Sequence, residues 1–227
     1  MAPRNEPKGK LEQGTDPIEL PGVFGILPLR NSVLFPQAVM PISVGREKTL
    51  RLIDDAIKDG KPIAVVSQKD PATDDPEPDA MYRFGTAARI LKAIRIGGNN
   101  VNLIIQGVSR VRVVRWVQSA PFLTAEFERL EETHETGIEV EALARNLTNQ
   151  FQRLVAIHPN LSGELGEMVQ SAEEASRLAD LISSAMPLPV AEKMALLVET
   201  STRMRLERLT EIVAREIEVT ELGSKIQ

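Results

Sequence analysis

The most constraining feature of this sequence is a change of pattern near residue 131. Before that point, short Val- and Ile-rich runs alternate with turn signals, which is typical of β-strands. After it, apolar residues recur every three or four positions, as in helices that bury one face. Residues 1–130 carry 18 basic and 15 acidic side chains, whereas residues 131–227 carry 9 and 17. Two parts of different architecture are the simplest interpretation.

The first part, 21–131, is expected to be β-rich and to hold one helix. Three apolar runs predict short strands, at 23–29, 38–44 and 62–67. Pro41 lies inside the second run and cannot donate a ladder hydrogen bond, so this strand should lie at an edge or contain a bulge. Helical spacing over 46–60 predicts a helix, and Gly60 is expected to end it.

The clearest β signal is a hairpin. Residues 85–96 and 101–117 are rich in Ile and Val, and they flank a Gly-Gly-Asn-Asn turn at 97–100. Alternation in the second strand slips at Val113 and Val114, which predicts a bulge or a bend.

One more alternating strand is expected over 122–128, and the acidic, proline-containing stretch 69–80 should be a solvated loop. Five or six short strands around one helix predict a small, partly open barrel or sandwich. An α+β fold class follows, because the rest of the chain is helical.

The second part, 132–227, is expected to be a helical bundle. Periodicity predicts helices over 140–158, over 171–186, after Pro189, and from Ser201 onward. Ser171 and Glu174 fit a capping box at the start of the second of these helices. The last pattern persists to the end of the sequence, which suggests that the polypeptide continues in a longer protein. The polar stretch 1–20 is expected to be a disordered tail.

Composition excludes several kinds of site. The chain has no cysteine, so it can hold no disulfide, thiolate nucleophile or Cys-based zinc site. Two histidines, His134 and His158, are too few for a His-rich metal site, and structural or solvent roles suit both. No apolar run approaches the roughly 20 residues that span a bilayer. Neither a phosphate-binding glycine loop followed by lysine nor a GxSxG elbow occurs, so we expect no catalytic residues, metal or cofactor in this chain.

What remains is a surface that binds another chain. Apolar residues cluster near prolines and at the hairpin tip, and charged residues follow on the first helix. An apolar patch with a polar rim would orient an extended peptide. The candidate substrate-binding residues are Phe35, Pro36, Met40, Ile42, Arg46, Glu47, Lys48, Arg51, Ile96 and Val101. The alternative is that the apolar ones complete the core and the charged ones are merely solvated.

The order of several short segments resembles the start of bacterial Lon proteases. The first are LPLR at 27–30, VLFP at 33–36, MPI at 40–42 and VGREK at 44–48. Later matches are VVSQK at 65–69, FGTA at 84–87, QGVSR at 106–110, RLAD at 177–180 and MPL at 186–188. No single segment is diagnostic, but their joint order over residues 24–227 indicates the N-terminal domain of a Lon protease of the LonA type.

The resemblance implies a PUA-like β subdomain followed by a helical subdomain whose last helix runs toward an ATPase module. It implies a non-catalytic module for substrate recognition and hexamer assembly in a cytoplasmic, ATP-dependent Ser-Lys protease that degrades misfolded and selected regulatory proteins. ATP and Mg would belong only to modules outside this chain. The implied partners are unfolded or damaged proteins and further copies in a homohexamer, with no membrane.

Two other functions stay open at this point. PUA-like barrels can bind RNA, and five arginines on neighbouring strands could line one face: Arg89, Arg95, Arg110, Arg112 and Arg115. A net charge of −5 and an aromatic content of 4% argue against nucleic acid. The other alternative is a free-standing relative of this domain that acts as an adaptor or ligand-binding protein.

Overall fold

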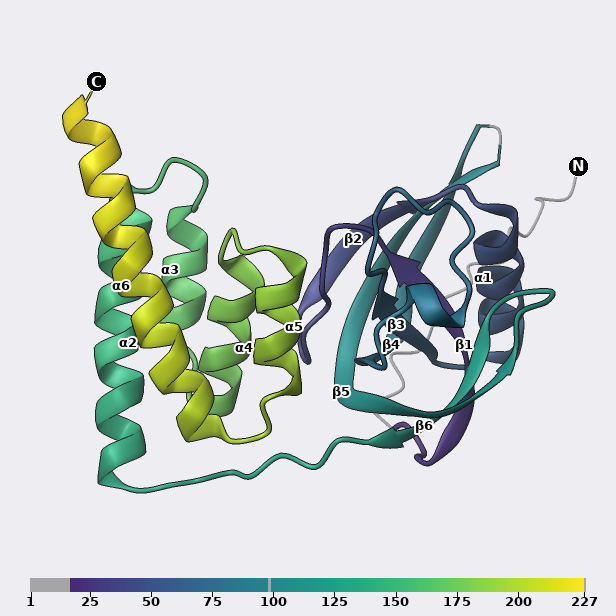
Figure 1. Cartoon of the computed structure of the whole chain (residues 1–227), viewed down its shortest axis with the longest axis horizontal. Helices are drawn as coiled ribbons and strands as arrows, with labels where there is room; N and C mark the ends of the chain where they lie inside the picture. The colour runs from purple at the N-terminus through teal and green to yellow at the C-terminus, as the bar shows by residue number, and fades with distance from the viewer. Residues whose placement is uncertain (1–16, 98, 227) are drawn as a thin grey trace, which may run out of the picture.

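The computed structural model describes residues 17–97 and 99–226, with side chains up to Gly223. A small barrel and a set of helices lie next to each other and are joined by one extended segment (Figure 1). The sheet ends at Arg129, and the first helix of the second part begins at Ile138. This arrangement confirms the expected α+β class, with a β-rich part followed by helices.

The β-rich part is a barrel with one additional edge strand. Its strands are β1 (Gly22–Leu29), β2 (Val39–Val44), β3 (Ile63–Ser67), β4 (Phe84–Ile96), β5 (Asn100–Gln118) and β6 (Thr124–Arg129). The strand order is β2-β5-β4-β3-β1-β6, and β6 also pairs with β5, which closes the barrel. Closure depends on the length of β5, because its first half pairs with β2 and its second half with β6.

Local signals in the sequence placed several details of the barrel correctly. Pro41 lies in β2, which pairs only with β5 among the described strands and is therefore an edge. The register of β5 against β6 shifts between Val113 and Arg115, as the slip in alternation predicted. Helix α1 (Glu47–Asp59) ends at Gly60, whose φ of 63° is left-handed and favours glycine.

The helical part contains α2 (Ile138–Ile157), α3 (Gly163–Gln170), α4 (Ala175–Ala185), α5 (Val190–Val198) and α6 (Thr202–Ile226). Helix α3 was not predicted, and the capping box was wrong. Ser171 lies at the C-terminal end of α3, where its hydroxyl donates to the Met168 carbonyl oxygen. Helix α4 begins at Ala175, and no side chain caps it.

Packed structure begins before residue 21. The predicted tail falls mostly on residues 1–16, which lie outside the described residues, but Ile18 is buried in a core cluster of the barrel. The stretch 69–80 is largely exposed, as expected of a loop, and it includes the short 3-10 helix η1 (Pro78–Ala80).

Candidate functional site

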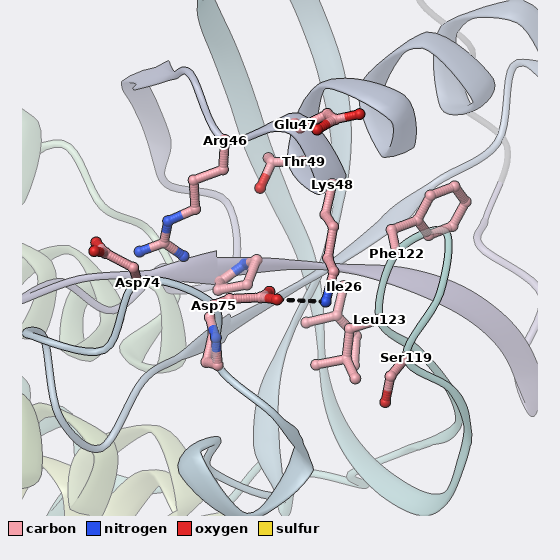
Figure 2. A pocket seen from close by; sticks show the side chains of 12 residues that line it. Ile26, Arg46, Glu47, Lys48, Thr49, Asp74, Asp75, Ser119, Phe122 and Leu123 are labelled. Atoms are coloured by element: carbon pink, nitrogen blue, oxygen red, sulfur yellow. Dashed lines mark hydrogen bonds and ion pairs between the residues drawn. The ribbon is translucent and has the colours of Figure 1, made fainter.

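A pocket of about 250 Å³ lies at the N-terminal end of α1 (Figure 2). Strand β1, the first turn of α1, the loop at 74–76 and the β5–β6 connection form its walls. Its lining residues are Ile26, Pro28, Arg46, Glu47, Lys48, Thr49, Asp74, Asp75, Pro76, Ser119, Phe122 and Leu123. The pocket therefore combines charged groups with an apolar wall.

Ion pairs hold the acidic loop against the pocket. Lys48 Nζ lies 2.6 Å from Asp75 Oδ2, and Arg30 Nη2 lies 2.6 Å from Asp74 Oδ1. The hydrogen bond to Asp75 raises the pKa of Lys48, so this lysine stays charged at neutral pH. Both pairs are exposed, so we expect each to contribute less than about 1 kcal/mol to stability.

Arg46 has a side-chain donor that is not used. Its Nη2 donates to Gln68 Oε1 at 2.8 Å, while its buried Nη1 has no hydrogen-bond partner among the described residues. Burial, together with the charge of Arg30, lowers the pKa of Arg46. A buried N–H without a partner costs free energy.

The predicted charged residues separate into two groups. Arg46, Glu47 and Lys48 line the pocket together. Arg51 is not among the lining residues and instead forms an ion pair with Glu47, one turn earlier on the exposed side of α1.

Most of the apolar residues predicted to bind substrate are not exposed. Phe35 and Val101 are buried in two different core clusters, with exposed fractions of 0% and 4%, and Pro36 is also buried. Met40 and Ile42 are half-buried, and both pack against the barrel core. These five were wrong as a contiguous exposed patch, because alternation directs Met40 and Ile42 to the inner face of β2, and Phe35 inserts into the helical core.

The outer face of β2, β5 and β4 carries the exposed apolar side chains. Val39, Ile94 and Ile96 are 55%, 47% and 47% exposed. The pairings Pro41 to Ile104 and Ile104 to Lys92 place these residues on one face, because side chains two apart on a strand share a side. We call Val39, Pro41, Ile94, Ile96 and Ile104 the apolar sheet face.

Of the residues on the apolar sheet face, only Ile96 was among the candidate binding residues from the sequence. Val39, Pro41, Ile94 and Ile104 were not among them. Their alternation with inward residues is visible in the sequence, but the grouping needs the register of three strands. The face also carries polar neighbours, so the exposed apolar groups are bordered by groups such as Lys92 and Asn102.

The arginines of the RNA alternative do not form an open basic face. Arg110 is buried, whereas Arg112 pairs with Glu128, Arg115 with Glu126 and Arg95 with Asp54. Arg89 is half-buried on β4. Four of the five arginines are therefore neutralised by carboxylates of the same chain, which leaves less positive charge for phosphates.

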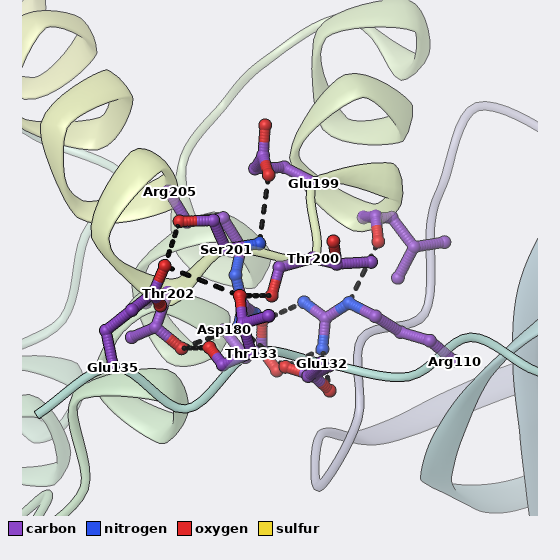
Figure 3. Close-up of polar contacts among 12 residues, drawn as sticks. Arg110, Glu132, Thr133, Glu135, Asp180, Glu199, Thr200, Ser201, Thr202 and Arg205 are labelled. Carbon is purple, nitrogen blue, oxygen red and sulfur yellow. Dashed lines mark hydrogen bonds and ion pairs between the residues drawn. The ribbon is translucent and has the colours of Figure 1, made fainter.

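A cluster of buried charged side chains lies where the barrel meets the helices (Figure 3). Arg110 of β5 and Arg205 of α6 are both fully buried, and each donates to Asp180 of α4 and to Glu132 of the connecting segment. Arg110 Nε also donates to the Leu197 carbonyl oxygen at 2.8 Å. We call these four side chains the buried ionic network.

The buried ionic network has a structural role, because it connects the barrel to the helices. Burial raises the pKa of Asp180, whereas the hydrogen bond from Arg110 and the charge of Arg205 act in the opposite direction. The guanidinium groups therefore offset part of the cost of burying this carboxylate. Every member of the network contacts another member, so the network fixes the barrel against the helices.

A second set of contacts attaches the connecting segment to the start of α6. Thr133 N donates to the Thr200 carbonyl oxygen at 3.0 Å, and Ser201 Oγ donates to Glu135 Oε1 at 2.6 Å. Ser201 Oγ also accepts a hydrogen bond from Met204 N, as an N-cap residue does. The hydrogen bond from Ser201 lowers the pKa of Glu135.

Glu135 is expected to make stability depend on acidic pH. A carboxyl whose pKa is lowered by folding stabilises the native state above its unfolded pKa of about 4.3, and this contribution is lost as pH falls through the folded pKa. Glu135→Gln should therefore unfold at lower urea concentration than the parent chain at pH 7, and the difference should shrink toward pH 3. Glu131→Gln, an exposed position in the same segment, is the control. A difference that stays constant with pH would contradict this assignment.

The remaining sequence candidates have local roles. His158 ends α2, and its Nδ1 accepts a hydrogen bond from Asn160 N at 3.2 Å while its Nε2 lies 3.5 Å from Glu216 Oε1. His134 is exposed on the connecting segment. Within residues 17–97 and 99–226, no group of three or more His, Asp or Glu side chains is arranged to hold a metal ion. None of the helices described there combines the length and hydropathy that a membrane span requires.

Comparison with known proteins gives one consistent family. A family model described as the ATP-dependent protease La (LON) substrate-binding domain matches residues 24–215. Lon protease 2 of Myxococcus xanthus is 40% identical over 92% of this chain and 25% of its own length. Lon protease of Dictyoglomus thermophilum is 38% identical over 92% of this chain and 26% of its own length. The chain thus spans about a quarter of these relatives.

Two solved structures share the fold. The N-terminal domain of a Mycobacterium avium complex Lon protease superposes with a TM-score of 0.69 at 22% identity, covering 85% of this chain and 98% of that one. A Lon N-terminal domain protein from Xanthomonas campestris gives a TM-score of 0.61 at 21% identity, with 83% and 96% covered.

Proposed function

This chain belongs to the family of Lon protease substrate-binding domains, and we propose that its apolar sheet face binds apolar segments of unfolded or damaged polypeptides. The observation that carries the proposal is the exposure of Val39, Ile94 and Ile96 on one face of a rigid sheet. Folded proteins bury such segments and damaged ones display them, so an exposed apolar face distinguishes the two.

The pocket at α1 supplies the polar half of the proposed interaction. Strand β2 ends at Val44, and Gly45 alone separates it from Arg46 at the start of α1. Lys48, which also lines this pocket, carries N–H groups beyond the one used by Asp75 that could donate to a main-chain carbonyl, and every polypeptide carries such carbonyls whatever its sequence. An apolar face combined with a polar donor elsewhere on the same part of the chain would favour extended segments without strong sequence preference.

Each such contact is weak, since the apolar sheet face is small and interrupted by polar residues. We propose that the chain acts as a non-catalytic module of a longer ATP-dependent protease, in which several copies form a hexamer. Several weak sites in one ring raise the effective concentration of the second and later contacts, and therefore the avidity. ATP, Mg and the peptide-cleaving residues would be supplied by the rest of that protein.

The proposal is tested by removing apolar surface without disturbing the core. The purified chain should bind a destabilised protein more tightly than the native form of the same protein. Ile94→Ser with Ile96→Ser should weaken binding by about tenfold. Each change removes the apolar surface of an isoleucine side chain that is roughly half exposed and therefore available for contact. Fluorescence anisotropy with a labelled, permanently unfolded protein measures this change.

A matched control makes the same kind of change, exposed apolar residue to serine, at a position outside the apolar sheet face. Val114 and Val117 are 46% and 42% exposed and lie in the half of β5 that pairs with β6. Val114→Ser with Val117→Ser should leave binding unchanged. Equal weakening by both pairs, or equal affinity for folded and destabilised protein, would rule out the apolar sheet face as the capture site.

A further inference from the structure

A second and larger depression lies in the helical part, with a volume of about 820 Å³. It is bounded by the connecting segment at 134–137, the first half of α2, the α3–α4 connection, the start of α4 and Thr202. We call it the helical groove. It shares no lining residue with the pocket at α1 and none with the apolar sheet face.

The floor of the helical groove is apolar and made of small side chains. Val140 and Leu178 are buried beneath it, while Ala144, Ala172 and Ala175 are only partly covered. Alanines at these positions leave room above the core that larger side chains would fill. Such a floor accepts apolar side chains from an incoming segment.

The rim of the helical groove is acidic. Four glutamates line it, Glu135, Glu141, Glu173 and Glu174, against a single arginine, Arg145. Glu141, Glu173 and Glu174 are exposed and have no ion-pair partner among the described residues. Their negative charge is therefore not neutralised within the part of the chain that the structure describes.

We propose that the helical groove binds a cationic amphipathic segment of a partner polypeptide, with Leu- or Val-like side chains on the alanine floor and Lys or Arg side chains at the glutamate rim. The charge of the groove favours this occupant over an acidic or uncharged one. The net charge of −8 over residues 131–227 steers cations toward this part of the chain. This binding is separate from the capture proposed for the apolar sheet face.

The test uses the 227-residue chain and three labelled dodecapeptides. The first is built of leucine and lysine in a helical pattern, the second replaces lysine with glutamate, and the third replaces leucine with serine. The Leu/Lys peptide should bind about tenfold more tightly than either of the others, because both halves of the groove contribute. Glu141→Lys with Glu173→Lys should weaken its binding by about the same factor.

Two further variants distinguish binding in the helical groove from non-specific attraction of a cationic peptide to the negative net charge of the chain. Glu164→Lys with Glu167→Lys changes the net charge equally at exposed positions of α3 outside the groove, and it should leave the affinity nearly unchanged. Arg145→Glu removes the one arginine of the rim and should tighten binding several-fold, a gain that misfolding cannot produce.

Equal weakening by the α3 pair and the groove pair would overturn the proposal in favour of non-specific charge attraction. A change of oligomeric state in the Glu141→Lys, Glu173→Lys chain would also overturn it, because the groove would then be occupied by a second copy. Ile94→Ser with Ile96→Ser should not alter binding of the Leu/Lys peptide, so failure of the sheet-face proposal and failure of the groove proposal give different results.

Discussion

Replacing Arg110 by alanine is expected to lower the free energy of unfolding by about 3–5 kcal/mol, as when one partner is removed from a buried ion pair. The change removes the donors to Asp180, Glu132 and the Leu197 carbonyl oxygen in a fully buried position. Arg205 alone then has to balance two carboxylates. Urea denaturation followed by circular dichroism measures the loss.

Arg112→Ala is the matched control, because Arg112 lies two residues further along β5 and forms an exposed pair with Glu128. It should cost less than about 1 kcal/mol. A double variant with Asp180→Ala should lose less than the sum of the two single changes, since the partners belong to one network. Equal losses for Arg110→Ala and Arg112→Ala would contradict the role assigned to the buried ionic network.

The loss in Arg110→Ala should also depend on pH. Without Arg110, burial raises the pKa of Asp180 with less opposition. A carboxyl whose folded pKa lies above its unfolded pKa favours the native state at low pH, and this advantage is lost as pH rises through the folded pKa. The difference between the parent chain and Arg110→Ala should therefore be smaller at pH 4 than at pH 7.

The second large effect is expected at Phe35. This side chain has an exposed fraction of 0% and belongs to the core cluster of the helices, although it lies in the connection between β1 and β2. Phe35→Ala should lower the free energy of unfolding by about 3–5 kcal/mol, because it leaves a cavity where the barrel contacts the helices. Val39→Ala, at an exposed position nearby, should cost within about 0.5 kcal/mol.

Phe35→Ala also discriminates between a core residue and a binding residue. At a temperature where the variant is still folded, its affinity for an unfolded protein should equal that of the parent chain. Weaker binding by a fully folded Phe35→Ala chain, with unchanged stability, would return Phe35 to the binding surface.

Features decided by neighbours in the sequence were predicted correctly. The hairpin, the edge position of Pro41, the end of α1 at Gly60 and the bulge at Val113 each depend on a few adjacent residues. Ser171 shows the limit of such signals: a serine before Glu174 resembles an N-cap, but its hydroxyl was already used by the end of α3. The sequence GELGEMVQ of α3 contains two glycines, which weaken the helical pattern.

Features decided by distant partners could not be read from the sequence. Arg110 alternates with apolar residues in the same way as a solvated arginine does, and only the fold brings Asp180, 70 residues away, within reach of it. Phe35 and Val101 lie near turns, where apolar residues are often exposed. In the fold, however, each is covered by an element from elsewhere in the chain. Of the candidate site, Arg46, Glu47 and Lys48 lie together because they are consecutive at the start of α1, whereas Arg51 lies one turn further along.

Pro41 in the edge strand has a consequence for strand pairing with other chains. An unpaired strand edge is a template on which another chain can extend the sheet, and aggregation can propagate from it. Pro41 deprives this edge of an N–H in the middle of β2, which spoils that template. Extension of the sheet by another chain at this edge is therefore disfavoured, and so is edge-to-edge pairing between two copies of this chain.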